Sequence, residues 1–227
     1  MGREALLGEV IRSCEPDVVI LEEASRPDVV KRLAEDCGMP HWGSRFGESV
    51  AWMSHEQPSA ATWHKPWVLK RAWLNLDLSS LRIIGVHLAA IHSNVTERRR
   101  VWEARTILSS LQRDRFHLLT GDFNSIAPGE HLDLRRLPAR LRTIAWATGG
   151  PIRWRTIALL LAAGYVDAQR MLHPEPAHSF PTWDPQMRLD YCFVPAEQQT
   201  RVVSCDVVLP SAAREASDHF PLLTVID

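Results

Sequence analysis

Polar residues stand where apolar stretches of this sequence end, and their residue types could carry out chemistry. They are Glu22 and Glu23 after the apolar run 18–21, His87 within 83–88, Asp122 and Asn124 after 116–119, Asp190 within 188–191, and Asp218 with His219. Taken alone, an acid at a strand end is most often a turn former or a helix cap. Ligand groups gather where strand ends face one crevice, so the whole set indicates one site.

The side chains in this set are chemically consistent with one another. Carboxylates and an amide, with no cysteine among them, suit a hard cation such as Mg²⁺ or Mn²⁺ better than zinc. A histidine beside an acid can change its charge near neutral pH, and a second carboxylate can orient it. Hydrolysis of a phosphate ester needs charge neutralisation on the phosphate, a positioned water and help for the leaving oxygen. The set therefore fits phosphate-ester hydrolysis.

The apolar periodicity predicts the elements that must position these residues. Helices are expected over 4–14, 28–37, 96–112 and 156–163, with Thr96 as the N-cap of the third. Strands are expected over 18–21, 50–53, 67–78, 81–88, 116–119, 188–194, 201–209 and 221–225, with 49–88 as an antiparallel meander. After residues 120–124, the chain is expected to be irregular up to about Arg155. Helices at both ends and a strand-rich middle favour a mixed α/β fold of two packed sheets with helices on the outer faces.

The composition predicts one ordinary soluble domain. The chain has 227 residues, of which 45% are hydrophobic, and a net charge of -1. Such a charge offers no overall positive field for holding long nucleic acid. No apolar run approaches the roughly 20 residues that a membrane span needs. The 4 cysteines form no CxxC pair and favour reduced thiols in a cytoplasmic protein. We expect the protein to be a monomer.

Five sequence blocks, in order, resemble the signatures of the endonuclease/exonuclease/phosphatase superfamily, the DNase I-like metal-dependent phosphoesterases. The blocks are PDVVILEE (16–23), GVHL (85–88), GDFNS (121–125), RLDYCFV (188–194) and SDHFP (217–221). The resemblance covers nearly the whole chain from Pro16 onward and implies a four-layer α/β sandwich of two mixed sheets. It also implies cleavage of phosphate esters with Mg²⁺ or Mn²⁺.

The resemblance also implies roles for individual residues. Glu23 would be the principal metal ligand, with Glu22 standing where the family usually has Gln, and Asp218 would support the metal from the opposite side. Asp122 and Asn124 would bind the attacking water and a phosphate oxygen. Asp190 would orient His219, which would either activate water or stabilise the pentacovalent phosphate. His87 would contact the phosphate or assist the leaving group, as in the DNase, sphingomyelinase and phosphatase branches.

The chain departs from the family pattern at its start. Family members begin with a strand that ends in an Asn, whereas this chain starts inside the following helix and has no Asn before Asn75. We therefore expect residues 1–227 to form a single, N-terminally truncated domain in which the neighbours of the absent strand have open edges. The alternative to an active enzyme is an impaired family member that acts as a binding or scaffold protein.

The expected partner is a phosphate-ester substrate, and one segment suggests which kind. Arginines occur at 135, 136, 140, 142, 153 and 155, with Trp146 and Trp154 among them. This Arg135–Arg155 region could hold the phosphate backbone of nucleic acid or stack a base. The alternative is a solvated segment with no ligand. Arg98, Arg99 and Arg100 are expected on the solvent side of their helix, and the eight histidines other than His87 and His219 on the surface or in loops.

Overall fold

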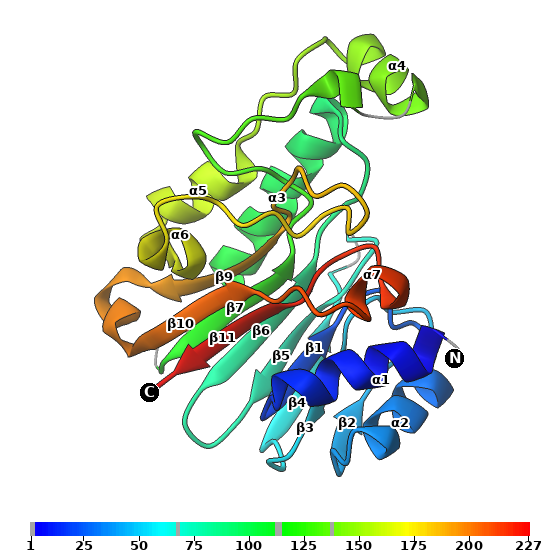
Figure 1. Ribbon diagram of the computed structural model, residues 1–227. Coiled ribbons are helices and arrows are strands. Elements are labelled where there is room, and N and C mark those ends of the chain that lie inside the picture. The colour runs from blue at the N-terminus through cyan, green and yellow to red at the C-terminus, as the bar shows by residue number, and fades with distance from the viewer. Residues whose placement is uncertain (1–2, 67–68, 112–114, 137–138) are drawn as a thin grey trace.

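The computed structural model describes residues 3–66, 69–111, 115–136 and 139–227 (Figure 1). Its helices are α1 (Arg3–Cys14), α2 (Pro27–Asp36), α3 (Asn94–Ser110), α4 (Ala139–Ala147), α5 (Thr156–Ala162), α6 (Ala168–Leu172) and α7 (Ala213–Ala216), with 3₁₀ helices η1 (Leu134–Arg136) and η2 (Ala196–Arg201). Its strands are β1 (Val18–Leu21), β2 (His41–Gly43), β3 (Ala51–Ser54), β4 (Ala60–His64), β5 (Trp73–Asp77), β6 (Arg82–His87), β7 (His117–Asp122), β8 (Tyr165–Asp167), β9 (Asp190–Pro195), β10 (Val202–Val207) and β11 (Leu222–Ile226).

The larger sheet has six strands in the order β4-β5-β6-β7-β9-β8. β6 and β7 run parallel, and every other neighbouring pair in this sheet is antiparallel. Parallel neighbours need a crossover connection, which α3 supplies between β6 and β7. The sheet is therefore mixed, and its central strands are the ones that carry the GVHL, GDFN and RLDY blocks.

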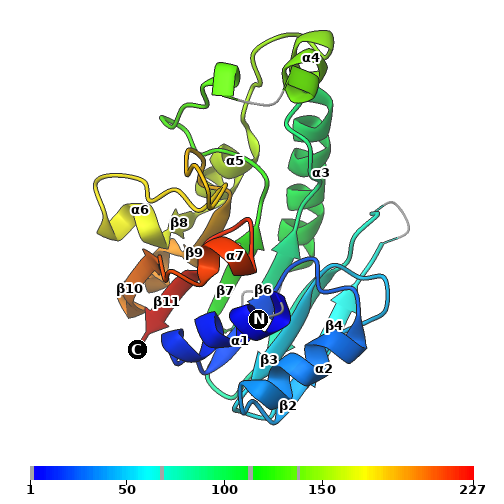
Figure 2. The ribbon, with the colours of Figure 1, turned by 45° about the vertical axis from the view of Figure 1, so that its right-hand side comes forward.

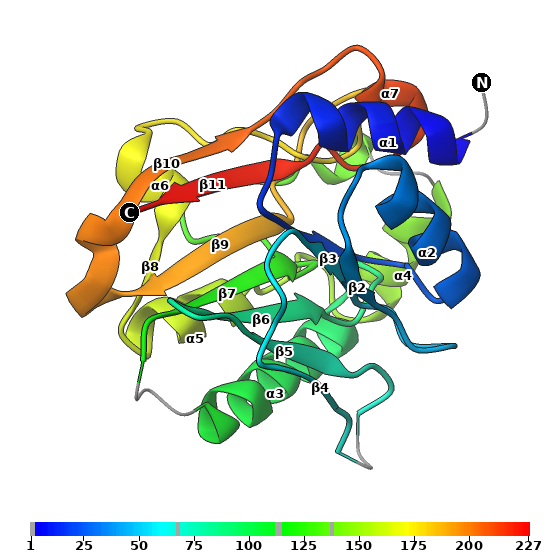
Figure 3. The ribbon, with the colours of Figure 1, turned by 90° about the horizontal axis from the view of Figure 1, so that it is seen from below.

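The second sheet layer consists of two antiparallel pieces, β1-β3-β2 and β10-β11. In the described part of the chain β1 and β11 are edge strands that do not pair with each other (Figure 3). Their residues are mostly only half-buried, although those of β3 are fully buried. Among the described strands only the larger sheet mixes parallel and antiparallel pairs, whereas two mixed sheets were expected.

Helices cover both outer faces, which gives four layers. On the six-stranded sheet, Ile107 of α3 and Ile157 and Leu160 of α5 pack against residues of β6, β7 and β9. On the other side, α1 and α2 pack over β1 and β3, while α1 also contacts α7. Seen from below, the layers follow one another in this order (Figure 3). The fold is thus the expected α/β sandwich.

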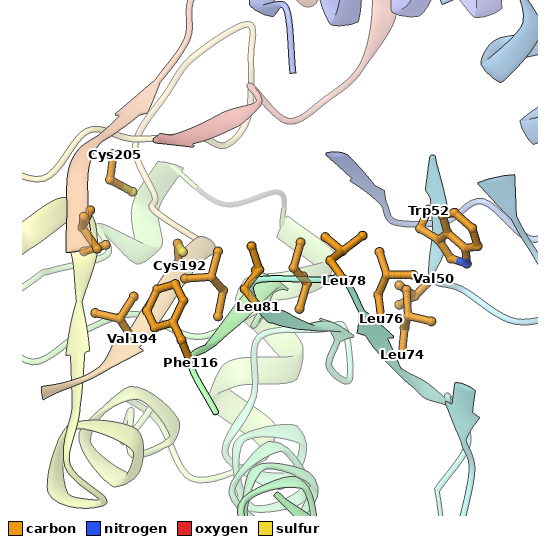
Figure 4. Packing of buried hydrophobic residues seen from close by; sticks show 14 residues of the cluster. Val50, Trp52, Leu74, Leu76, Leu78, Leu81, Phe116, Cys192, Val194 and Cys205 are labelled. Carbon is orange, nitrogen blue, oxygen red and sulfur yellow. The ribbon is translucent and has the colours of Figure 1, made fainter. Parts of the chain in front are cut away.

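The core between the two sheets follows from strand alternation. Val18 and Ile20 of β1 face the six-stranded sheet, whereas Val19 and Leu21 face the helices. Figure 4 shows this inter-sheet cluster, which runs from Trp52 at one end to Cys205 at the other. Each fully buried side chain of this kind contributes about 1.5–3 kcal/mol. The two sheets are therefore held face to face, and residues that continue the inward alternation beyond the strand ends meet in the space between them.

Several local expectations were wrong. The N-cap of α3 is Ser93, and Thr96 is the N3 partner that completes a capping box with it. The segment expected to be irregular contains η1 and α4, and α4 stands apart from the sheets beyond the start of α3 (Figure 2). The expected meander is divided, because β3 joins the smaller sheet and β4, β5 and β6 form the meander. Residues 67–68 of the expected strand 67–78 and residue 112 of the expected helix lie outside the described residues.

In the described ranges no helix is long and apolar enough to cross a membrane. All 4 cysteines are free, with Cys192 and Cys205 buried and Cys14 and Cys37 half-buried.

Candidate active site

Three site residues lie in one row across neighbouring strands of the larger sheet. His87 at the end of β6 is the register partner of Asp122 at the end of β7. Asp122 is in turn the register partner of Asp190 at the start of β9. Register partners present their side chains on the same face, so sequence positions far apart are brought side by side by strand pairing alone.

The row faces the space between the sheets. In β6 and β7, Ile83 and Leu118 belong to the inter-sheet core, and alternation carries that side of the sheet on to His87 and Asp122. Cys192 does the same for Asp190 in β9. The side chains of His87, Asp122 and Asp190 therefore lie between the two sheets, at a polar end of the apolar core.

His219 joins the row from the segment before β11. Its Nδ1 donates a hydrogen bond of 2.8 Å to Oδ2 of Asp190, which also accepts a 2.5 Å hydrogen bond from Oγ of Ser179. Phe180 lies against the imidazole, with ring centroids 4.6 Å apart. Burial lowers the pKa of His219, but the charge and hydrogen bond of Asp190, with smaller contributions from Asp122 and Asp218, outweigh burial and raise it to about 10. The structure thus favours the imidazolium form at neutral pH.

Asp122 and Asn124 form a compact pair at the end of β7. Oδ1 of Asp122 accepts from the backbone N–H of Asn124 at 2.8 Å, and Oδ2 accepts from Nδ2 at 2.6 Å. Asn124 adopts a φ of 50°, a left-handed conformation that Asn tolerates better than most residues. Burial, followed by the charge of Asp190, raises the pKa of Asp122 to about 7. Both side chains are buried and their orientation is fixed by these bonds.

His87 is buried beside Asp122. Its Nε2 lies 3.5 Å from Oδ2 of Asp122, and its Nδ1 is hydrogen-bonded to Oγ of Ser49. Burial, assisted by the positive charge of Arg71, lowers the pKa of His87 to about 3. The site therefore contains one neutral and one charged imidazole, which can serve different purposes.

The acids assigned to a metal by motif position lie differently from the row. Glu23 is exposed, with a φ of 56°, and Asp218 is exposed as well. Glu22 is half-buried and continues the inward side of β1 set by Val18 and Ile20. Burial raises the pKa of Glu22 well above its ordinary value, and the charges of Asp190 and Asp122 raise it further. Glu22 is thus the carboxylate of this pair that faces the row.

The donor set can be compared with the needs of a divalent cation. In the residues that the structure describes, no group of three or more Asp, Glu, His or Cys side chains could hold a metal ion as arranged. Mg²⁺ does not require such a cage, because it is commonly bound by one or two carboxylates together with waters and phosphate oxygens. Burial first, and then the negative charge of Asp190, raise the pKa values of Glu22 and Asp122, and a cation beside these carboxylates would oppose both effects. The carboxylate and amide groups of the site are therefore of the chemical type that binds a hard cation.

Glu22, which follows β1, lies close to Gly121 in β7, the first residue of the GDFN block. Gly121 has a φ of 132°, and a Cβ built there would lie 3.0 Å from Oε1 of Glu22 and 2.1 Å from the carbonyl oxygen of Val86. Only glycine lets the chain come this close. The first residue of the GDFN block therefore admits the carboxylate of the opposite sheet.

Sequence reasoning missed several residues around the site. Ser49 and Ser179 hold His87 and Asp190, and neither lies in one of the five sequence blocks. Arg71 donates a 2.7 Å hydrogen bond to the carbonyl oxygen of Leu88, next to His87. A serine in a loop carries no periodic or motif signal, so only the chain's path identifies these partners.

Two surface assignments were wrong. Arg100 is fully buried, although Arg98 is exposed as expected. His117 is buried within β7, and its Nε2 is hydrogen-bonded to the Tyr165 hydroxyl at 2.7 Å. His92 lies in a loop, as expected, and is buried there. Each of these groups is tolerated inside because a specific polar or aromatic partner lies next to it.

All arginines of the Arg135–Arg155 region are exposed, namely Arg135, Arg136, Arg140, Arg142, Arg153 and Arg155. Trp146 is 79% exposed on α4, and Trp154 is half-buried against His92. Arg136 forms an ion pair with Asp184, five residues before Leu189. The region thus presents positive charge and one aromatic face to solvent.

Comparison with known proteins supports this reading of the fold. The family model described as "Endonuclease/Exonuclease/phosphatase family" matches residues 2–219. A 3′ phosphatase, NExo, from Neisseria, solved as a single-residue variant bound to product DNA hairpin, superposes with a TM-score of 0.73 at 20% identity, covering 99% of this chain and 94% of that one. No match was found among curated proteins.

Two further solved structures are similar. An AP endonuclease from Archaeoglobus fulgidus has a TM-score of 0.70 at 19% identity, covering 99% of this chain and 95% of that one. An endonuclease/exonuclease/phosphatase from Beutenbergia cavernae has a TM-score of 0.72 at 21% identity, covering 97% of this chain and 65% of that one. At these identities the structural likeness establishes the fold.

Proposed function

Since the chain belongs to the endonuclease/exonuclease/phosphatase family, a family of phosphoesterases, we propose that it hydrolyses phosphate esters by in-line attack of water, with the help of a divalent cation. The observation that carries the proposal is the row of His87, Asp122 and Asp190, completed by the hydrogen bond from His219 to Asp190. The row brings together the imidazolium of His219, the oriented carboxylate oxygen atoms of Asp122 and Asp190, and the neutral imidazole of His87.

The cation we propose is Mg²⁺ or Mn²⁺. The carboxylates that would hold it are Glu23 and Asp218 by motif position, and Glu22 by its half-buried place beside the row. A bound divalent cation would neutralise negative charge on the phosphate.

Each polar side chain of the row then has a proposed part in the reaction. Asp122 and Asn124 would bind the attacking water and a phosphate oxygen, because their mutual hydrogen bonds hold them in one orientation. His219, held by Asp190, would stabilise the negative charge of the pentacovalent phosphate, a role that its raised pKa supports. Neutral His87 would contact the phosphate or assist the leaving group.

The substrate class we propose is nucleic acid. Support comes from the exposed arginines of the Arg135–Arg155 region, since no acidic residue occurs between Leu134 and Arg155. The Neisseria relative, which was solved with a DNA hairpin, adds to this support. Phosphate contacts of this kind position a nucleic acid without reading its sequence.

The first experiment measures hydrolysis of a generic aryl phosphodiester with Mg²⁺, with Mn²⁺ and with a chelator. Turnover that depends on the cation, and is lost in Asp122→Ala and His219→Ala, is the expected result. Turnover that survives both changes would overturn the assignment of the site. Plasmid nicking against release of inorganic phosphate from a sugar phosphate then separates a nuclease from a small-molecule phosphatase. Binding of partners without any turnover would favour the scaffold alternative.

A further inference from the structure

Glu97 is a buried acid in the first turn of α3 that the proposed chemistry does not use. It is 2% exposed, yet it accepts hydrogen bonds from several groups at once. Its Oε1 accepts from the backbone N–H groups of Arg155 at 2.7 Å and Thr156 at 2.8 Å, and from the Thr156 hydroxyl at 2.8 Å. Such a concentration of donors on one buried oxygen identifies a junction between chain segments.

The same carboxylate also holds the loop that carries Asn124. Oγ of Ser125, the residue after Asn124, donates to Oε1 of Glu97 at 3.1 Å and to Oε2 at 3.2 Å. Ser125 is fully buried. One acid on α3 therefore joins the loop after β7 to the end of the Arg135–Arg155 region.

Arg100 extends this junction to the loop after β6. Its Nε donates to Oε2 of Glu97 at 2.9 Å, and its Nη1 donates to the carbonyl oxygens of Ala89 at 2.7 Å and Ile91 at 3.0 Å. Ala89 comes two residues after His87. The pair thus connects the two loops that leave the central strands of the site.

The backbone at Ile91 shows why such a connection is needed. Ile91 has a φ of 75°, which is unfavourable for a β-branched residue and persists only where the surroundings impose it. Its carbonyl oxygen accepts from Arg100 and also from the Thr96 hydroxyl. The path of the loop after His87 is therefore imposed by α3.

We infer that Glu97, together with Arg100, is a positioning residue that fixes the site loops after β6 and β7 relative to each other and to the Arg135–Arg155 region. The inference rests on the proposed function. A small displacement of positioned groups can cost up to about a hundredfold in rate. Loosening this junction should therefore lower kcat for any substrate. It should also lower the affinity for a substrate that reaches the Arg135–Arg155 region.

The experiment uses variants that remove single donors, since Glu97→Gln leaves Arg100 buried without its counter-charge and can unfold the protein. Ser125→Ala should lower kcat on the aryl phosphodiester about tenfold with little change in KM, and Ser125→Thr should restore it. Thr156→Val should leave that kcat unchanged and raise KM for an oligonucleotide. Ser54→Ala is the matched control, because Ser54 is a buried serine of β3 whose Oγ accepts from the N–H of Glu56.

Amide hydrogen exchange of the substrate-free protein separates failure of this inference from failure of the proposed function. Ser125→Ala should speed exchange at Asn124, and at Arg155 and Thr156, relative to Ser54→Ala. The inference is overturned if Ser125→Ala keeps wild-type kcat, or if exchange rises no more than in the control. If the wild-type protein turns over no phosphate ester, the proposed function fails while the exchange result still decides the inference.

Discussion

Nδ1 of His219 donates a 2.8 Å hydrogen bond to Oδ2 of Asp190, and these two residues lie 29 positions apart in the chain. The bond joins the SDH block to the row of side chains on the larger sheet. It also sets the charge of the imidazole, because the pKa of His219 is raised to about 10 in spite of burial.

Asp190→Asn tests this relationship. Loss of the negative charge should lower the pKa of His219, since burial is then less strongly opposed. If the imidazolium is the active form, activity is present below the pKa and lost above it, so the alkaline limb of the pH–kcat profile should move to lower pH. We expect kcat at neutral pH to fall about a hundredfold or more.

The control for Asp190→Asn is Ser179→Ala, which removes a second donor to the same oxygen but keeps the charge. It should change kcat much less and leave the alkaline limb near its wild-type position. An unmoved alkaline limb in Asp190→Asn would contradict the assigned role of His219.

Glu22→Gln and Glu23→Gln are a matched pair of neighbouring substitutions. Glu22 has a raised pKa, so its ionised form destabilises the fold at neutral pH, and Glu22→Gln should raise the Tm of the metal-free protein. Mg²⁺ at about a hundred times its Kd should stabilise the wild type by about 2.7 kcal/mol. Thermal unfolding should show this stabilisation reduced in both variants, because both carboxylates are proposed to hold the cation. A variant that keeps the full wild-type stabilisation would exclude its carboxylate from the proposed cation site.

Arg140→Ser combined with Arg142→Ser tests the basic region. Both side chains are exposed, so the fold should be unaffected. Affinity for a single-stranded oligonucleotide should fall, and the slope of log affinity against log salt should become shallower by about 1.4, at about 0.7 per phosphate contact. Turnover of the aryl phosphodiester should stay unchanged. Lys31→Ser with Arg105→Ser, two exposed cations on α2 and α3, should leave the salt slope alone, and an equal effect there would contradict a specific surface.

His92→Phe tests the cost of a buried neutral imidazole. Burial, assisted by Arg100, lowers the pKa of His92 to about 4, and its buried Nε2 has no hydrogen-bond partner in the described structure. Because the unfolded chain binds a proton near pH 6.5 and the folded chain does not, stability should fall as pH drops from 6.5 towards 4. The slope from this group is at most about 1.4 kcal/mol per pH unit. Urea unfolding between pH 7 and 5 should show a smaller loss in His92→Phe, and equal losses would reject this assignment.

Arg188→Met tests the ion pairs beneath the site. Arg188 is fully buried and contacts Asp167 at 2.7 Å and Glu130 at 2.5 Å. Its removal leaves two buried carboxylates without a cation, which should cost about 3–5 kcal/mol in the free energy of unfolding. Arg26→Met, at a pair whose arginine is 65% exposed, should cost under about 1 kcal/mol. Urea denaturation measures both, and a similar small loss in the two variants would contradict the buried network.

The sequence by itself determined the fold class and the residues of the row. Strand alternation has a period of 2, so His87, Asp122 and Asp190 could be assigned to strand ends, and five ordered blocks then pointed to one family. The helix that crosses from β6 to β7 was also predictable, because its apolar face repeats at helical spacing. Local patterns were sufficient for these features because each depends on residues close together in the chain.

Only the tertiary structure decided which polar groups are buried and what they contact. Arg100 lies in a run of three arginines that looks like a solvent face, but Glu97 and the carbonyl oxygens of Ala89 and Ile91 receive it inside. Glu22 and Glu23 are equivalent in composition, and it is the packing of β1 on the larger sheet that turns Glu22 towards the row. The physical reason is that the free energy of a buried charge depends on partners from distant segments, and the sequence does not contain their positions.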